Sequence, residues 1–296
     1  MIGCVVTSFD DTFGTRVLEG LLDEAGADTH VVVKASNGSV ERENELIRAL
    51  VEAGIAGLIL LPSTTRFLPP AALELVMREF PVVVLDRSYA DVPVSAVFSD
   101  NAASAQRATE YLVDLGHTRL GFVASASEVS TTSERHGGYV RAHAVRHVPL
   151  DAARQLTDLT STLPGSVAPR AEVEAEIDRL TGFVRADPAT TGYLVTEYNL
   201  AVMLREACLR AGLSVPDDVS IVCFDHPTAF SDRELFRFTH VEQDQPELGR
   251  RAVQRLLEQI GGGTGTAVAK IEVPSAFVLA ESTAPARRLA RHPDEG

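Results

Sequence analysis

The sequence predicts an α/β protein built from two successive halves, each with a parallel sheet covered by helices. Short apolar runs alternate with longer stretches whose apolar residues recur at helical spacing. The short runs are almost continuously apolar, as strands buried on both faces of a parallel sheet require. A chain of 296 residues, 45% of them hydrophobic, can hold two such halves, each with a core of its own.

The first half is predicted to begin with an apolar strand at residues 2–6, a polar loop, and a helix that stops at Gly26. Further elements are expected as strands at 30–33, 57–61, 81–85 and 94–98, and as helices at 39–53 and 70–80. Because strands alternate with helices, the connections are crossovers and the strands lie parallel. The loops at residues 8–14 and 86–89 should therefore open on one edge of the sheet.

The second half begins at Asp100 and Asn101, which can cap a helix that ends at Gly116. Further strands are expected at residues 119–123, 193–196 and 219–224, with helices around Tyr139 and at 171–186 and 197–211. Residues 149–169 fit no regular element. The simple succession ends after Thr239, where a helix at 247–260, a glycine-rich turn at 261–265 and a late strand at 270–279 are expected.

The strand at 219–224 ends abruptly in the polar turn Asp225-His226-Pro227. In open α/β sheets, ligands bind at the carboxyl ends of strands. A carboxylate at that edge can accept hydrogen bonds from a hydroxyl-rich ligand or from a positioning arginine. The alternative is that Asp225 only caps the turn, and the local pattern does not separate the two.

Composition excludes several classes of function. A formal charge of −14 makes the chain a poor binder of phosphate backbone, which requires clustered Lys and Arg. The cysteines, Cys4, Cys208 and Cys223, are isolated within apolar runs and have neither disulfide nor zinc spacing, which indicates a reducing compartment.

No signal peptide and no apolar stretch long enough to span a membrane is present, so a soluble, cytoplasmic protein is expected. The sequence shows no nucleophile elbow, no glycine-rich phosphate loop after the first strand and no metal-ligand spacing. We therefore expect no enzyme, no cofactor and no metal.

Four stretches occur in a specific order and spacing. They are Ser99-Asp100-Asn101 with residues 111–122, Ser133-Glu134-Arg135-His136-Gly137-Gly138-Tyr139, residues 215–225, and residues 239–243 with Glu247-Leu248-Gly249. Together they resemble the effector-binding core of the LacI/GalR family of bacterial transcription regulators, and the match runs from residue 2 to residue 283.

This resemblance implies a periplasmic-binding-protein-like fold of type I, with two Rossmann-like lobes joined by three crossovers. The family pattern places the crossovers near Phe98, Thr239 and Gly261. The N-terminal lobe would then comprise residues 1–98 plus 241–261, and the C-terminal lobe residues 99–240 plus 262–296.

The resemblance also implies a ligand site between the lobes. The N-terminal lobe would contribute Asp10, Phe13, Asp86 and Gln243, and the C-terminal lobe Arg135, Glu197, Tyr198 and Asp225. Carboxylates and an amide suit vicinal hydroxyls, and an arginine fork can bind two oxygens at once. Phe13 or Tyr198 could cover an apolar ring face.

Each assignment has a simpler alternative. Arg135 could pair with Asp225 or Asp86 and stabilise the hinge. Phe13 could belong to a lobe core, Asp10 to a solvated loop, and Glu197 could be a helix N-terminal charge favoured by the dipole. Glu197-Tyr198 also departs from the Asn-Asp common in the family, which leaves the ligand's identity open.

The resemblance predicts the effector-binding and dimerisation core of a LacI-type regulator, whose effector is a sugar or a sugar phosphate. Operator DNA would be bound only through an N-terminal helix-turn-helix head, which is not in this chain because its first strand begins at residue 2. A homodimer is expected, and no membrane partner. The alternative is a solute-binding protein of a sugar transporter, which would have the same fold.

Overall fold

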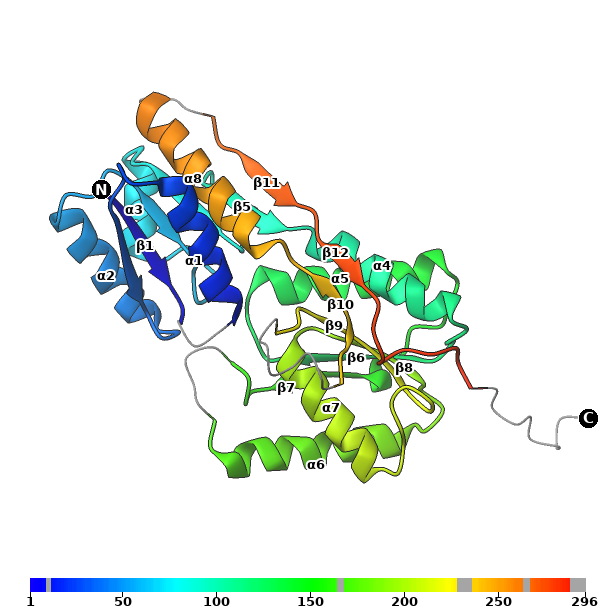
Figure 1. The fold of residues 1–296 in the computed structure, drawn as a ribbon. Helices are drawn as coiled ribbons and strands as arrows, with labels where there is room; N and C mark the ends of the chain where they lie inside the picture. The colour runs from blue at the N-terminus through cyan, green and yellow to red at the C-terminus, as the bar shows by residue number, and fades with distance from the viewer. Residues whose placement is uncertain (9–11, 164–167, 228–235, 263–266, 288–296) are drawn as a thin grey trace, which may run out of the picture.

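The computed structural model describes residues 1–8, 12–163, 168–227, 236–262 and 267–287, without the side chains of Thr12 and Phe13. Within these residues the chain forms two six-stranded sheets, each covered by helices on both faces (Figure 1). The predicted α/β class with two sheets is confirmed.

The sheet of the N-terminal lobe has the strand order β11-β5-β4-β3-β1-β2, and all its strands are parallel. Its strands are β1 (Ile2–Val6), β2 (Val31–Ala35), β3 (Leu58–Leu60), β4 (Val82–Leu85), β5 (Ser95–Ser99) and β11 (Lys270–Val273). Helices α1 (Thr12–Ala25) and α8 (Gln245–Gly262) cover one face. Helices α2 (Val40–Glu52) and α3 (Pro70–Met77) cover the other, which is why the central strands are apolar on both sides.

The sheet of the C-terminal lobe has the order β12-β10-β9-β8-β6-β7, with β12 antiparallel to β10. Its strands are β6 (Leu120–Ser125), β7 (Gln155–Leu159), β8 (Gly192–Val195), β9 (Ser220–Phe224), β10 (Thr239–Glu242) and β12 (Ala276–Val278). Helices α4 (Asn101–Asp114) and α5 (Ser130–Val145) cover one face. Helices α6 (Arg170–Ala186) and α7 (Tyr198–Arg210) cover the other, and the short 3₁₀ helix η1 (Ala152–Arg154) leads into β7.

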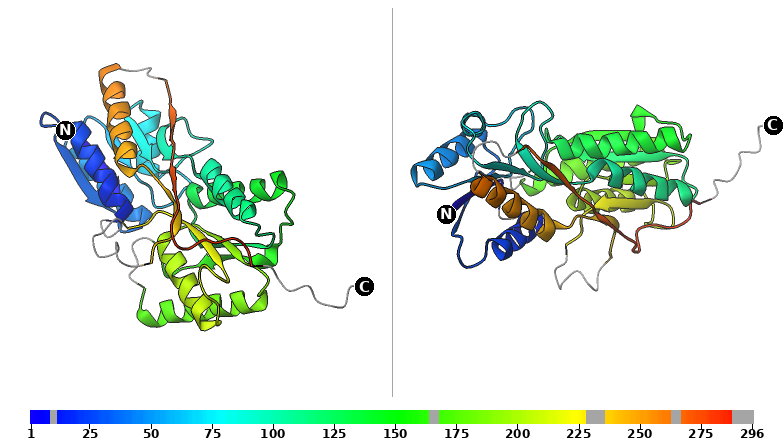
Figure 2. Two further views of the ribbon diagram at one scale, coloured as in Figure 1. Left: turned by 45° about the vertical axis from the view of Figure 1, so that its right-hand side comes forward. Right: turned by 90° about the horizontal axis from the view of Figure 1, so that it is seen from above.

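The chain passes between the lobes after β5, after β10 and between β11 and β12 (Figure 2). Asp100 joins the first and third of these passages. Its backbone N–H donates to the carbonyl of Val273 (3.1 Å), and its Oδ1 accepts from the backbone N–H of Ser275 (2.9 Å). Since β10 pairs with β12, the second passage runs beside the third. The three passages therefore form one hinge.

Strand pairing corrects parts of the sequence prediction. Residues 270–279 are not one late strand of the C-terminal lobe: β11 extends the N-terminal sheet beside β5, and only β12 joins the other sheet. Residues 241–242 belong to β10 and pair within the C-terminal lobe. A third passage near residues 274–275 thus replaces the one expected near Gly261.

The strand β7 lies in the stretch 149–169, which the sequence pattern left without an element. It is the edge strand of its sheet, and Thr157 and Asp158 are exposed. An edge strand with polar, exposed residues lacks the apolar run that marks a buried strand.

None of the helices in the described ranges combines the length and apolar character that crossing a bilayer requires.

Candidate functional site

Four of the predicted site residues lie at the boundary between the lobes because each comes shortly after the carboxyl end of a strand. Asp86 follows β4, Glu197 comes two residues after β8, Asp225 follows β9 and Gln243 follows β10. Asp86 and Asp225 both have positive φ angles, of 60° and 58°. Such backbone is uncommon outside glycine and often marks functional turns.

Arg135 is the central cation of this boundary. Its side chain is buried on α5, where Nε donates to Asn101 Oδ1 (2.9 Å) and Nη1 donates to the carbonyl of Thr196 (2.6 Å). Its guanidinium carbon lies 3.9 Å from the centre of the Phe224 ring, a cation–π arrangement. These contacts fix the plane of the guanidinium, and its Nη2 makes no hydrogen bond with any described residue.

Three carboxylates surround Arg135 at electrostatic range. Burial lowers the pKa of Arg135, and the charges of Asp225, Asp86 and Glu197 oppose that effect. Nevertheless, Arg135 forms no ion pair with any of them in the described part of the chain. The simple hinge pairing considered for Arg135 is therefore not what the structure shows.

Asp225 is held by two glutamines instead. Gln243 donates to it from its backbone N–H (3.3 Å) and from its side-chain amide, and Gln245 Nε2 donates to its Oδ1 (3.2 Å). Burial raises the pKa of Asp225, and Arg135 and these hydrogen bonds counteract the rise. Since Gln245 lies at the start of α8, Asp225 ties the C-terminal sheet to the other lobe.

One polar atom of the Gln243 side chain has no hydrogen-bond partner among the described residues. Its side chain is 3% exposed, and its Oε1 is buried without a hydrogen-bond partner among the described residues. A buried acceptor without a donor is costly. This atom is therefore ready to accept a hydrogen bond from a ligand hydroxyl.

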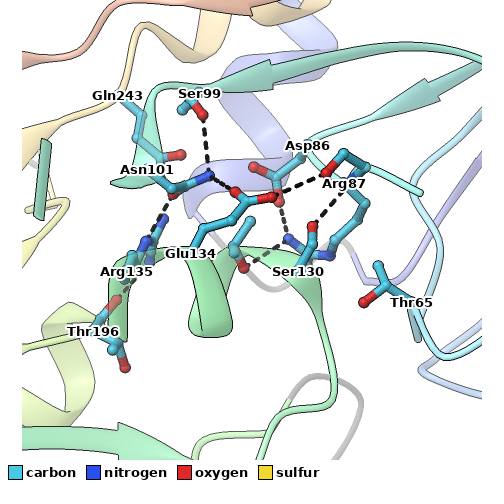
Figure 3. Close-up of polar contacts among 12 residues, drawn as sticks. Thr65, Asp86, Arg87, Ser99, Asn101, Ser130, Glu134, Arg135, Thr196 and Gln243 are labelled. Carbon is cyan, nitrogen blue, oxygen red and sulfur yellow. Dashed lines mark hydrogen bonds and ion pairs between the residues drawn. The ribbon is translucent and has the colours of Figure 1, made fainter. Parts of the chain in front are cut away.

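Asp86 is paired with its neighbour Arg87, whose Nη1 also approaches Thr131 Oγ1 of the opposite lobe at 3.4 Å. Beside this pair, the Ser88 N–H donates to Ser130 Oγ (3.1 Å) and the Ser88 hydroxyl donates to Glu134 Oε1 (3.0 Å). Figure 3 shows Glu134 between the two lobes, with its other oxygen accepting from Asn101 Nδ2 at 3.1 Å. A continuous polar network thus links the end of β4 to Arg135.

A second contact between the lobes lies further from the hinge. The N–H of Thr65 donates to the carbonyl of Glu128 (3.0 Å), and Arg66 forms an ion pair with the Glu128 carboxylate. On the other side of the boundary, Arg16 of α1 lies 3.9 Å from Glu242 of β10. The lobes are thus in direct contact in this arrangement.

Glu197 and Tyr198 begin α7. Glu197 is the N-cap residue and its Oε1 accepts from Thr162 Oγ1 at 2.5 Å. Tyr198 packs edge-on against His226 at a ring distance of 4.9 Å and lies 6.0 Å from Phe238, beside the core of its lobe. Tyr198 therefore packs partly against the core of its lobe. Glu197 lies close enough to Arg135 to raise the pKa of the guanidinium.

Two predicted residues remain outside this description. Asp10 lies in residues 9–11, outside the described residues, and the side chain of Phe13 is likewise not described. Four residues that sequence reasoning missed lie in the network: Asn101, Glu134, Phe224 and Gln245. Asn101, Glu134 and Phe224 stand in the family-like motifs, but only the fold shows that Asn101 and Glu134 contact each other across 33 residues of sequence.

The comparisons agree with this architecture. The profile of the periplasmic binding protein-like domain matches residues 109–283. The arabinose metabolism transcriptional repressor of Geobacillus stearothermophilus is 28% identical over 265 residues, covering 88% of this chain and 70% of that protein. The repressor CytR of Escherichia coli K12 is 27% identical over 278 residues, covering 91% and 76%.

Among solved structures, a LacI family regulator from Enterococcus faecium with bound ribose superposes with a TM-score of 0.76 at 23% identity, covering 97% of this chain and 99% of that one. The relatives are transcriptional repressors, which are not enzymes, and they favour a regulatory core over a transporter's binding protein. The chain belongs to the periplasmic binding protein-like domain family and is the effector-binding core of a LacI-type transcription regulator.

Proposed function

We propose that this core binds a sugar or a related hydroxylated molecule, phosphorylated or not, at the boundary between its lobes. The observation that carries the proposal is the setting of Arg135: a buried, rigidly held guanidinium with one unengaged nitrogen, among carboxylates from both lobes. Such a group can donate to a ligand oxygen without reorganising.

The proposed contacts combine donors and acceptors. Arg135 Nη2 would donate to one ligand oxygen, and Gln243 Oε1 would accept from a hydroxyl. Asp86, Glu197 and Asp225 would accept from further hydroxyls, and Asp10 and Phe13 remain proposed contributors from the first loop. A relative of this fold was solved with ribose, which supports a hydroxylated ligand.

Binding would alter regulation by stabilising one arrangement of the lobes. The contacts of Ser88 with Ser130 and Glu134, and of Thr65 with Glu128, exist only while the lobes touch. A ligand held by both lobes adds to these contacts and shifts the population toward closure. A helix-turn-helix head would pass that shift on to operator DNA in the cytoplasm.

We further propose a homodimer formed through α3. Phe67, Leu73 and Met77 are exposed by 51%, 39% and 79%, and they adjoin Leu68 and Pro70. Clustered exposed apolar side chains favour a protein interface. If the Met77→Glu variant sediments as a monomer, this interface is supported. The control is Val145→Glu, at an exposed position on α5, which should stay dimeric.

The ligand proposal is tested by calorimetric titration with a panel of pentoses, hexoses, disaccharides, nucleosides and their phosphate esters. We expect saturable binding of at least one member, lost in Arg135→Ala while circular dichroism shows an intact fold. No heat with any member of the panel would overturn the proposal.

A further inference from the structure

Two glutamine side chains at the lobe boundary are held by the same carboxylate. Gln243 Nε2 donates to Oδ2 of Asp225, and Gln245 Nε2 donates to its Oδ1 at 3.2 Å. The backbone N–H of Gln243 also donates to Oδ1 (3.3 Å), and the N–H of Gln245 donates to the carbonyl of Gln243 (2.9 Å). Both amides are therefore fixed around the carboxylate that follows β9.

The carboxylate of Asp225 decides which way each amide faces. An amide side chain has one end that donates and one that accepts, whereas an ionised carboxylate only accepts. Burial raises the pKa of Asp225, but Arg135 and the three hydrogen bonds from the glutamines oppose that rise. With the carboxylate ionised, each glutamine turns its nitrogen toward Asp225, which leaves its carbonyl oxygen for another partner.

Neither carbonyl oxygen has such a partner in the described part of the chain. Oε1 of Gln243 and Oε1 of Gln245 are both buried, and neither accepts a hydrogen bond from a described residue. The two residues are only 3% and 5% exposed. A buried acceptor without a donor costs free energy, and two such acceptors lie beside one carboxylate here. A molecule that donates to both would remove both penalties.

Two neighbouring hydroxyl groups fit this corner of the boundary. A hydroxyl donates, as the glutamine oxygens require, and it also accepts, as the unengaged Nη2 of Arg135 requires. Ether and carbonyl oxygens only accept and cannot bond to either glutamine oxygen. Because both amides are tethered to one carboxylate, hydroxyls on adjacent carbons of one small molecule can reach both oxygens.

We infer that Gln243 and Gln245 together bind two neighbouring hydroxyls of the effector, and that Gln245 is a specificity-determining residue for this diol. The inference rests on the proposed function and deepens it, since it names the part of the effector that this corner recognises. Asp225 is the positioning residue that orients both amides. An analogue that lacks one of the two hydroxyls leaves a buried glutamine oxygen unpaired.

The test on the whole wild-type chain removes ligand hydroxyls one at a time. Calorimetry compares the pentoses, hexoses, disaccharides and nucleosides of the titration panel with analogues that lack one hydroxyl, such as 2-deoxyglucose and 3′-deoxyadenosine. For a parent that binds, removal of either of two adjacent hydroxyls should weaken binding about tenfold or more. A parent that binds without such an adjacent pair overturns the inference and leaves the proposed function intact. Silence of every parent overturns both.

Gln245→Leu assigns one of these hydroxyls to its acceptor. Affinity for the parent should fall about tenfold, whereas the analogue without the hydroxyl that Gln245 accepts should lose much less. The ratio of parent to analogue affinity should therefore approach one for that analogue. A purely structural role, including the lost hydrogen bond to Asp225, would weaken parent and analogue alike and keep the ratio.

The control is Gln254→Leu, the same substitution at a half-buried position on the same helix, α8. It should keep the wild-type ratio for every analogue. If Gln245→Leu also keeps every ratio, Gln245 does not contact the effector and the inference is wrong. The analogue series on the wild-type chain decides the matter even if circular dichroism shows that Gln245→Leu does not fold.

Discussion

The guanidinium of Arg135 on α5 stacks 3.9 Å from the centre of the Phe224 ring, the last residue of β9. The aromatic face supports a buried cation that Asn101 and Thr196 orient in its plane. One helix and two strand ends thus fix a single donor group at the lobe boundary.

Arg135→Lys tests that arrangement. Lysine keeps the charge but cannot donate to Asn101 and Thr196 and still present a further N–H in a fixed direction. We expect ligand affinity to fall about tenfold or more, since a charge-assisted hydrogen bond is worth roughly 1.5–3 kcal/mol. Calorimetry measures the loss. Arg179→Lys, an exposed α6 residue paired with Asp158, is the control and should bind normally.

The contact between Ser88 and Ser130 gives a prediction about closure. Ser130→Ala removes the oxygen that accepts from the Ser88 N–H across the boundary. We expect a several-fold weaker ligand affinity, in keeping with a hydrogen bond worth about 1 kcal/mol, and an unchanged melting temperature. The control is Ser133→Ala, whose hydroxyl bonds within α5 to the Ser130 carbonyl. Equal affinities in the two variants would show that this contact does not favour the bound form.

The sequence predicts the two-lobed fold well because buried parallel strands are continuous apolar runs. The runs that become β1, β3, β4, β6, β8 and β9 are all buried throughout. The edge strand β7 lacks this signal, and β11 cannot be assigned to a lobe from its own residues. The strand β11 pairs with β5 because the chain crosses the hinge after β11, where Val273 lies beside Asp100.

The site was only partly predictable. Positions after strands predicted Asp86 and Asp225, the resemblance of its motif predicted Arg135, and both carboxylates lie within electrostatic reach of Arg135. The partners of these groups were not predictable, since Asn101 and Gln245 meet them through contacts between distant segments. Tyr198 was expected to cover an apolar ring face of the ligand, and that contact stays a prediction. Its ring packs against His226 and Phe238.

Glu43 gives a prediction about pH. It is fully buried on α2, where Oε1 accepts from the N–H of Ser63 at 2.7 Å and from the hydroxyl groups of Ser63 and Ser36. Burial raises the pKa of Glu43 above 4.5, despite hydrogen bonds that lower it. The folded state therefore retains a proton that the unfolded state releases, and stability declines as pH rises from 4.5 through the folded pKa.

Glu43→Gln removes this titration. We expect its free energy of unfolding, relative to wild type, to increase as pH rises above 4.5, because only the wild type loses stability when Glu43 ionises. Denaturant titrations at several pH values measure the slope. Glu41→Gln is the control on the same helix. A backbone hydrogen bond and Ser39 lower the pKa of Glu41, so removing this carboxylate should change the pH dependence of unfolding only below pH 4.5. If the free energies of unfolding of wild type and Glu43→Gln changed with pH in the same way above pH 5, the raised pKa of Glu43 would be contradicted.

The crossing of α1 and α8 gives the last prediction, because it depends on two glycines. A Cβ at Gly249 would overlap the carbonyl oxygen of Val17 and lie 2.6 Å from the backbone nitrogen of Leu21, and one at Gly20 would overlap Pro246. Backbone atoms cannot move aside as a flexible side chain can, so Gly249→Ala must separate the helices. We expect a loss of about 1–3 kcal/mol in unfolding free energy.

The control is Gly182→Ala on α6, where nothing lies within 4 Å of the new Cβ. This variant should instead gain about 0.5–1 kcal/mol in unfolding free energy from helix propensity. Thermal unfolding of both variants decides the matter, and a Gly249→Ala protein as stable as wild type would show that α1 and α8 do not pack this closely.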